Sequence, residues 1–198
     1  MRPLPWNLER AMLFIGVAAF WAAAYLGTAG FNAARAPRVL AWDAIWIFPF
    51  VSAFVVPYLS AYALPFVAAA SLRDRAKFRR FAAVAVGTMA FSAICFILFP
   101  LTLARPEIPL ASLSDRLLAA LYAADRPTNL FPSLHVSLSF LFALAVGDAR
   151  PRLRPWMIAW AALVAVSTLF TRQHYLIDVV GGVIVAWIAW RIYLPKSR

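Results

Sequence analysis

The sequence holds two histidines, His135 and His174, and each lies at the boundary of an apolar segment. Asp178 follows His174 by four residues, so both side chains face the same way if that segment is helical. A carboxylate in this place accepts a hydrogen bond from one ring nitrogen and leaves the other nitrogen able to attack an electrophile. The second histidine can then protonate the leaving group. The sequence therefore predicts a nucleophilic histidine, an orienting aspartate and a general acid.

Three further polar residues predict what the electrophile is. Arg172 ends the fifth apolar segment, Arg105 follows the third, and Ser133 opens the fourth directly after Pro132. A helix N-terminus presents free backbone N–H groups and a positive dipole, and guanidinium groups bind phosphate through paired hydrogen bonds. These residues predict a phosphate-binding pocket in which fixed positive charge stabilises a phosphoryl group in transfer.

A metal ion or another cofactor is not expected in this pocket. Magnesium binds through carboxylates, and Asp178 is the one carboxylate that the pattern clearly places there. Zinc needs more nitrogen or sulfur ligands than two histidines supply, and the single cysteine gives no metal motif. Asp43, Glu107 and Asp125 are interpreted as solvated loop residues, although the last two lie in the loop that borders the pocket.

The composition indicates that a membrane-spanning bundle positions these residues. Of the 198 residues, 64% are hydrophobic and 14% are charged, whereas soluble domains are about half apolar and a quarter charged. A helix needs about 20 residues to cross the hydrocarbon core. The apolar segments cover residues 11–29, 42–70, 78–101, 133–147, 156–170 and 177–194. We therefore expect an all-α bundle of six transmembrane helices in one domain over residues 1–198, with prolines kinking the second helix.

The distribution of Lys and Arg predicts the orientation of this bundle. Thirteen of the 19 basic residues lie on the side that includes both termini, and six lie on the other side. Cytoplasmic loops are enriched in Lys and Arg, so both termini are expected in the cytoplasm, while the loop 102–132 and the turn at Arg172 are expected outside. Both histidines then lie at one outer depth. The net charge of +11 has the same explanation, so no nucleic-acid partner is expected.

The outer loop contains an amphipathic stretch over residues 110–124. Leu113, Leu117 and Leu121 recur at helical spacing, and Asp115 lies off that stripe. A short helix lying on the membrane surface is the simpler interpretation, and a lid over a lipid entry path is the sharper one. In the last segment, the pair Gly181 and Gly182 predicts close helix packing.

Two stretches around these residues resemble signatures of the type 2 phosphatidic acid phosphatase superfamily. The run FPSLHVS, from Phe131 to Ser137, is similar to the second signature, and TRQHYLIDV, from Thr171 to Val179, is similar to the third. Arg105 with Pro106 looks like a remnant of the first. The resemblance covers about residues 100–182 and implies a metal-independent, six-helical enzyme that acts on lipid phosphates at the outer face. It implies a phosphohistidine at His174, an orienting Asp178, an acid at His135 and phosphate binding by Arg172, Arg105 and Ser133.

Three departures from the family pattern bear on the acceptor. Leu98 stands where the first signature has a lysine, Leu134 stands where the second has a glycine, and Arg172 precedes His174 by two residues instead of six. These forms resemble the branch that contains inositol phosphorylceramide synthases and, more distantly, sphingomyelin synthases, whose members pass a phospho-headgroup to an alcohol. The acceptor is left open between water, which is slightly favoured, and an alcohol.

Two other function classes are left open by the residues alone. Two histidines at one depth on different helices are also the pattern of a bis-histidine haem protein that transfers electrons. The other class is a transporter or an assembly subunit that has no enzymatic activity. We expect an integral protein of a bacterial inner (plasma) membrane, with the site on the periplasmic or extracellular side. The identity of the lipid and the oligomeric state do not follow from the sequence.

Overall fold

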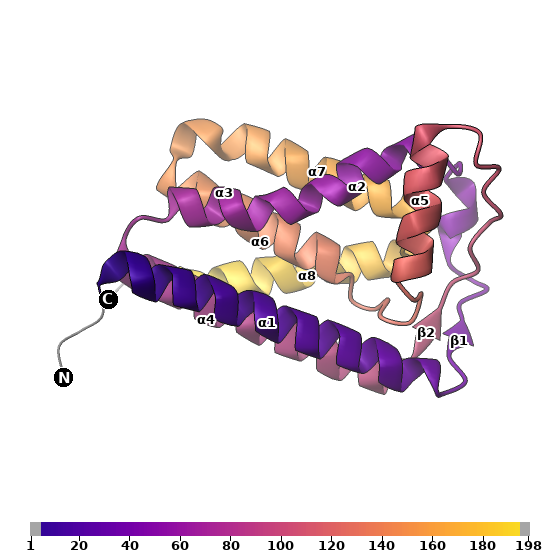
Figure 1. Cartoon of the computed structure of the whole chain (residues 1–198), viewed down its shortest axis with the longest axis horizontal. Helices are drawn as coiled ribbons and strands as arrows, with labels where there is room; N and C mark the ends of the chain where they lie inside the picture. The colour runs from indigo at the N-terminus through magenta and orange to yellow at the C-terminus, as the bar shows by residue number, and fades with distance from the viewer. Residues whose placement is uncertain (1–4, 195–198) are drawn as a thin grey trace.

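A computed structural model describes residues 5–194 as an elongated helical bundle (Figure 1). The long helices are α1 (Trp6–Ala33), α4 (Arg75–Leu98), α7 (Arg154–Phe170) and α8 (Leu176–Tyr193). The shorter helices are α2 (Val55–Ser60), α3 (Leu64–Ser71), α5 (Leu113–Ala124) and α6 (Leu134–Ala149). The one pair of strands in this part of the chain is β1 (Arg38–Val39), which runs parallel to β2 (Leu101–Thr102).

Within residues 5–194, five helical segments are long and apolar enough to cross a membrane. They are Trp6–Ala33, Ser52–Ser71, Arg75–Leu98, Pro151–Phe170 and Leu176–Tyr193. The sixth expected span corresponds to α6, which is apolar but has 16 residues and therefore measures about 24 Å against about 30 Å for the hydrocarbon core. The all-helical class and the membrane-type composition are confirmed, and the count of six crossings stays a prediction.

The second apolar segment folds differently from the expectation of one span over residues 42–70. Residues 44–47 form a 3-10 turn, and the chain is then extended until residue 52. From there Ser52–Ser71 is built from short helical pieces, α2 and α3 with single 3-10 turns before and between them. Pro57 and Pro65 lie in these pieces, and proline lacks the N–H that a regular helix needs. The kink was predicted correctly, but the helix begins about ten residues later than expected.

Helix α6 lies at the centre of the bundle and packs against α3, α4, α7 and α8. Two glycines of α8 explain how closely α6 and α8 approach. A Cβ atom on Gly182 would lie 2.8 Å from the Ser133 carbonyl oxygen, and one on Gly181 would lie 2.6 Å from the Phe131 ring. The predicted close packing at these glycines is confirmed, and it fixes the start of α6 against the first turns of α8.

The two ends of the bundle differ in character. Helix α5 and the two strands lie at one end, where α5 crosses the direction of the long helices, while α1 begins and α8 ends at the other (Figure 1). Ser112 and Asp115 form a reciprocal capping box that starts α5. Leu118 of α5 is fully buried, while Leu113 and Leu117 are exposed. The predicted amphipathic helix is therefore present, with Leu113 and Leu117 facing away from the bundle.

Candidate functional site

The two histidines lie side by side at the end of the bundle that carries α5. The centroids of the His135 and His174 rings are 6.1 Å apart. His135 comes from the first turn of α6, and His174 comes from the turn between α7 and α8. The separation leaves room for a small group bonded to both rings. The expected convergence of the two histidines is therefore present in the structure.

His174 has the expected carboxylate beside it. Its Nδ1 lies 3.4 Å from Asp178 Oδ2, and both side chains are buried. This distance is within ion-pair range but long for a hydrogen bond, and neither His174 Nδ1 nor Asp178 Oδ1 has a hydrogen-bond partner. Such contacts often shorten when substrate is bound. Asp178 Oδ2 also accepts the Tyr175 backbone N–H at 2.8 Å, so the same carboxylate starts helix α8 and orients the histidine.

His135 is surrounded by two tyrosines that the sequence analysis did not single out. Its Nδ1 lies 3.3 Å from the Tyr58 hydroxyl, and its Nε2 lies 3.5 Å from the Tyr62 hydroxyl. The Tyr58 ring packs against the imidazole at 4.5 Å between centroids. The spacing of four residues between Tyr58 and Tyr62 is a signal that they share a helix face, but nothing in the sequence indicates that this face meets His135.

Asp43 is not the solvated loop residue that we expected. It is 5% exposed, and its carboxylate accepts backbone N–H groups from Ile45 at 2.8 Å and from Leu176 and Ile177 at 3.0 Å each. Two of these donors belong to the first turn of α8, whose N–H groups have no partner within the helix. Asp43 therefore fixes the start of the helix that carries Asp178. Its position inside an apolar segment, where a charge is costly, was the available signal.

Arg105 reaches the same end of the bundle, as expected, but most of its donors are already in use. Its Nη1 donates to the carbonyls of Tyr122, at 3.1 Å, and Asp125, and its Nη2 donates to Gln173 Oε1 at 2.6 Å. The guanidinium also lies 4.3 Å above the Tyr122 ring. Its Nε is buried without a hydrogen-bond partner, so one donor of this arginine is free for an anion.

Gln173, directly before His174, is a site residue that sequence reasoning missed. It is 2% exposed, and its Nε2 has no partner, although its Oε1 is held by Arg105. A buried donor without an acceptor is unfavourable and rare in folded proteins. Gln173 Nε2 and Arg105 Nε are thus two linked, unsatisfied donors next to the histidine pair, as an anion-binding site requires.

Arg172 lies close to the site, and its hydrogen-bond partners in the structure are backbone carbonyls. Phosphate binding by this residue stays a prediction. Its guanidinium donates to the backbone carbonyls of Ile45 and Phe48 and lies 5.2 Å from the centroid of the Trp46 ring. The residue is 7% exposed and has a positive φ of 51°. Burial lowers the pKa of the guanidinium, and the nearby Tyr122 hydroxyl opposes this shift. These contacts tie the turn that carries His174 to the segment that carries Asp43.

Ser133 is the N-cap of α6, in accordance with the simple interpretation of its place after Pro132. Its hydroxyl accepts the Val136 N–H at 3.3 Å, and its own N–H donates to the Asp178 carbonyl at 3.0 Å. The residue is fully buried. Ser133 thereby joins the first turn of α6, where His135 lies, to the first turn of α8, and phosphate binding by this residue stays a prediction.

Asp125 also differs from the expectation of a solvated residue, whereas Glu107 is exposed as expected. The Asp125 side chain is 16% exposed, accepts the Tyr25 hydroxyl at 2.8 Å and lies 3.6 Å from Arg105 Nη2. Burial raises the pKa of Asp125, while the Tyr25 hydrogen bond and the charge of Arg105 act in the opposite direction. Its twenty-residue separation from Arg105 left no sequence signal for this pairing.

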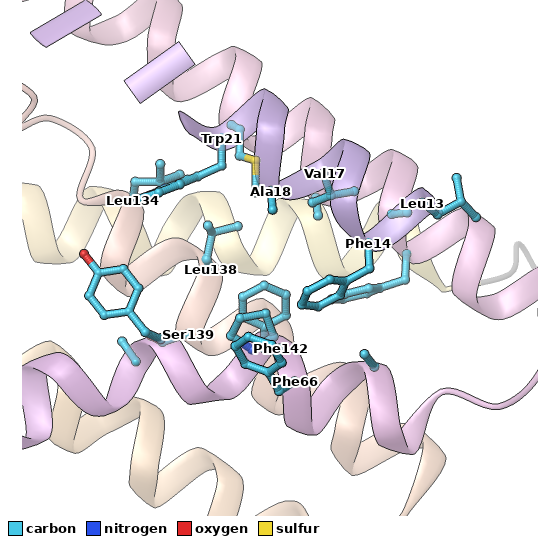
Figure 2. Close-up of a pocket in the computed structure, with 18 of the residues that line it drawn as sticks. Leu13, Phe14, Val17, Ala18, Trp21, Phe66, Leu134, Leu138, Ser139 and Phe142 are labelled. Carbon is cyan, nitrogen blue, oxygen red and sulfur yellow. The ribbon is translucent and has the colours of Figure 1, made fainter. Parts of the chain in front are cut away.

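An apolar cavity of about 290 Å³ opens directly beneath His135. Residues of α1, α3, α4 and α6 line it, and Figure 2 shows Phe14, Phe66 and Phe142 gathered towards one end, with Trp21 and Leu134 towards the other. The polar pocket around the histidines therefore continues into a space with hydrocarbon walls. No group of three or more His, Cys, Asp or Glu side chains within residues 5–194 is arranged to hold a metal ion.

Comparison with known proteins agrees with this arrangement. The chain is 39% identical over 72 residues to the uncharacterized protein MJ0662 of Methanocaldococcus jannaschii, a stretch that covers 36% of this chain and 29% of that protein. Residues 48–192, which include both histidines, Asp178 and Gln173, match the PAP2 superfamily. This match extends over more than half of the chain. The protein described here belongs to the PAP2 superfamily, whose members are phosphatases and phosphotransferases.

Proposed function

We propose that this protein is a metal-independent membrane enzyme that removes a phosphoryl group from a lipid phosphate through a phosphohistidine at His174. The observation that carries the proposal is the arrangement of three side chains, with the two imidazole centroids 6.1 Å apart and Asp178 Oδ2 3.4 Å from His174 Nδ1. Membership of the PAP2 superfamily supports the same chemistry.

The first step transfers the phosphoryl group to the enzyme. His174 Nε2 attacks phosphorus while Asp178 stabilises the positive charge that develops on the imidazole. The bond between phosphorus and the lipid oxygen breaks, and protonated His135 gives its proton to that oxygen, so a neutral lipid alcohol leaves. The donors at Arg105 Nε and Gln173 Nε2 stabilise the charge on the phosphoryl oxygens.

The second step returns the enzyme to its starting state. His135, now neutral, accepts a proton from a water molecule, whose oxygen attacks the phosphorus of the phosphohistidine. The bond between nitrogen and phosphorus breaks, and inorganic phosphate leaves with His135 protonated again. Water is the favoured acceptor. An alcohol acceptor is the second candidate, because the runs around Leu134 and Gln173 resemble the inositol phosphorylceramide synthase branch of the family.

We further propose six membrane crossings, with the site at the outer face of a bacterial plasma membrane and both termini in the cytoplasm. The distribution of Lys and Arg supports this orientation. The structure is compatible with it, since α1 begins and α8 ends at the end of the bundle opposite the histidines (Figure 1). A cysteine introduced at exposed Glu107 is expected to react with an impermeant thiol reagent in intact cells, while one at exposed Arg152 is not.

The decisive experiment measures phosphate release from a panel of lipid phosphates in the presence of a metal chelator. Wild-type protein is expected to be active, and His174→Ala is expected to lose activity below detection. Wild-type protein quenched during turnover of radiolabelled lipid phosphate should carry acid-labile label, and His174→Ala should carry none. Activity that disappears with the chelator, or that survives in His174→Ala, contradicts the mechanism.

Two further measurements separate the alternatives. Product analysis with labelled lipid phosphate, with and without candidate alcohols such as inositol, distinguishes transfer to water from transfer to an alcohol. A visible absorption spectrum of the purified protein distinguishes the enzyme from a bis-histidine haem protein, for which a Soret band is expected. Membership of the PAP2 superfamily favours the enzyme.

A further inference from the structure

We propose that the cavity beneath His135 is a slot for one hydrocarbon chain of the substrate, entered sideways from the membrane between α1 and α3. The proposal rests on the proposed function and names the kind of lipid that the site selects, a lipid phosphate that inserts a single chain. The walls are apolar side chains of α1, α3, α4 and α6. At one end of the slot lie His135 and Tyr62, and the hydroxyl of Tyr62 lies 3.5 Å from the imidazole.

The distribution of polar groups along the slot requires an occupant with one polar end. Ser139 lies one turn below His135 on α6, lines the cavity, is 1% exposed and has a hydroxyl without any hydrogen-bond partner. An ester or amide carbonyl of an acyl lipid would lie at this depth when its phosphate lies at the histidines. Beyond Ser139 the lining is hydrocarbon and aromatic, so the rest of the occupant must be apolar.

The slot has a side entrance at the seam between α1 and α3. Helix α1 packs mainly on α4, while α3 packs on α6. Two ring pairs span the seam, Phe14 with Phe66 at 5.2 Å and Trp21 with Tyr62 at 6.2 Å. Phe66 and Tyr62 both line the cavity and are 63% and 44% exposed at the outer surface of the bundle. Rotation of these two side chains therefore opens the slot to lipid without moving a helix.

Arg10 contacts two wall residues at the far end of the slot, and we infer that it closes this end. Its guanidinium donates to the Ala69 carbonyl and lies 5.6 Å from the centroid of the Phe78 ring. On α1 the lining runs from Tyr25 to Leu13, which at 1.5 Å per residue is about 18 Å. An extended chain advances about 1.25 Å for each C–C bond of about 1.5 Å, so the slot accommodates about 14 chain atoms counted from its histidine end.

The test compares two adjacent alanines of α4. Ala82 lines the slot and is 6% exposed, whereas Ala83 faces outward on the same helix. Ala82→Phe fills the slot and Ala83→Phe is the matched control. Ala69→Phe, from the opposite wall, with Ala70→Phe as its control, provides a second pair if Ala82→Phe does not fold.

Two readouts test binding in the slot independently of the phosphoryl-transfer reaction. The first is the rise in Tm that tetradecanoyl glycerol phosphate produces in a sterol-based detergent, since a ligand that binds the folded state stabilises it. The second is turnover of this lipid against turnover of water-soluble butyl phosphate. Because each buried methylene contributes to affinity, Ala82→Phe is expected to lose the rise in Tm and to raise the KM for the lipid at least tenfold, with butyl phosphate turnover unchanged. Ala83→Phe is expected to resemble wild type in every readout.

The outcomes distinguish failure of the slot from failure of the proposed function. If both variants of a matched pair bind and turn over the lipid equally well, the slot is wrong while the phosphatase stands. A second outcome is that wild type binds the lipid and the slot-filling variant does not, while neither protein releases phosphate from any substrate. In that case the slot stands and the proposed function is wrong. In wild type, the KM should fall with chain length until about 14 chain atoms extend below the phosphate and then level off, and a continued fall for longer chains contradicts the closed end at Arg10.

Discussion

The two histidines occupy contrasting surroundings although their rings are neighbours. His174 lies among charged and amide groups, with Asp178 at 3.4 Å and Gln173 held by Arg105. His135 lies against tyrosine rings at the entrance of an apolar cavity. The difference teaches how one pocket performs two tasks. In the proposed mechanism, the polar side holds the nucleophile and binds the anion, and the aromatic side contacts the lipid and its leaving oxygen.

The polar side is also the more firmly held. Asp43, Asp178 and Ser133 each join two chain segments through backbone hydrogen bonds, and Arg172 ties the turn before His174 to residues 45–48. On the aromatic side, Tyr62 is exposed and its hydroxyl contact with His135 is at the limit of hydrogen-bonding distance. We infer that the nucleophile is preorganised while the aromatic side adapts to the incoming chain.

The largest expected effect separates the roles of the two histidines. His135→Gln removes the acid, so turnover of an alkyl lipid phosphate is expected to fall by about 10²–10⁴-fold. An aryl phosphate such as p-nitrophenyl phosphate needs little help to lose its leaving group, so its first step, measured as the burst of p-nitrophenol, should be slowed far less. The second step, in which His135 is the base, is slowed for both substrates. His174→Gln should abolish turnover of both substrates. Equal losses in the first-step rates of the two substrates in His135→Gln would show that His135 is not the acid.

The second prediction tests whether the polar side depends on Asp43. Asp43→Ala leaves three buried N–H donors without an acceptor, two of them at the start of α8. Each unsatisfied donor costs about 1–3 kcal/mol, and partial relaxation of the loop leaves an expected loss of about 3 kcal/mol in stability. Thermal unfolding in detergent measures it, with exposed Glu107→Ala as the control. An unchanged Tm in Asp43→Ala would contradict the anchoring role.

The sequence predicts the bundle well because the bilayer imposes a strong constraint on it. Apolar length alone located five of the helical segments within a few residues. The exception is the stretch from residue 42 to 51, which is as apolar as a span but folds as a turn and an extended segment at the end of the bundle that carries the histidines. Hydropathy cannot distinguish apolar chain that crosses the membrane from apolar chain that packs over the site.

The candidate site was predictable in so far as its members are close in sequence. His174 and Asp178 are four residues apart. The more distant His135 was placed beside them by the expected six-span topology and by the resemblance of both stretches to family signatures. Asp43, Tyr58 and Asp125 reach the site from distant parts of the chain, so their roles depend on tertiary packing that no local pattern encodes. Arg172 shows a further limit, since no sequence pattern indicated that its guanidinium donates to two backbone carbonyls, and phosphate binding by this residue stays a prediction.

The third prediction sharpens the assignment of the anion site to the polar side. Gln173→Leu removes the unsatisfied Nε2 donor and the acceptor that holds Arg105. The KM for a lipid phosphate is expected to rise about tenfold, the value of one hydrogen bond to a charged group, and inorganic phosphate should inhibit less strongly by a similar factor. Gln173→Glu keeps the acceptor but replaces the donor with a carboxylate, so it should impair phosphate binding still more. A KM that is unchanged in both variants would remove Gln173 from the site.

The smallest expected effect concerns Asp125, which connects the two sides through its hydrogen bond from Tyr25, a residue of the cavity wall, and its ion pair with Arg105. Burial raises the pKa of this carboxyl above its ordinary value of 3.8. An acid with a raised pKa in the folded state stabilises the fold most when it is protonated. Its contribution is complete below about pH 3.8 and is lost as the pH rises through the folded-state pKa.

Asp125→Asn removes this titration, so the Tm of wild type relative to the variant is expected to decline by a few degrees as the pH is raised from about 4. Thermal unfolding at a series of pH values measures the difference, and Glu107→Gln, which changes an exposed carboxyl, should show no such trend. A difference that grows with pH would mean that the Arg105 pair outweighs burial. In that case Asp125 belongs to the polar side, with the charged groups around His174, whereas its partner Tyr25 belongs to the aromatic side.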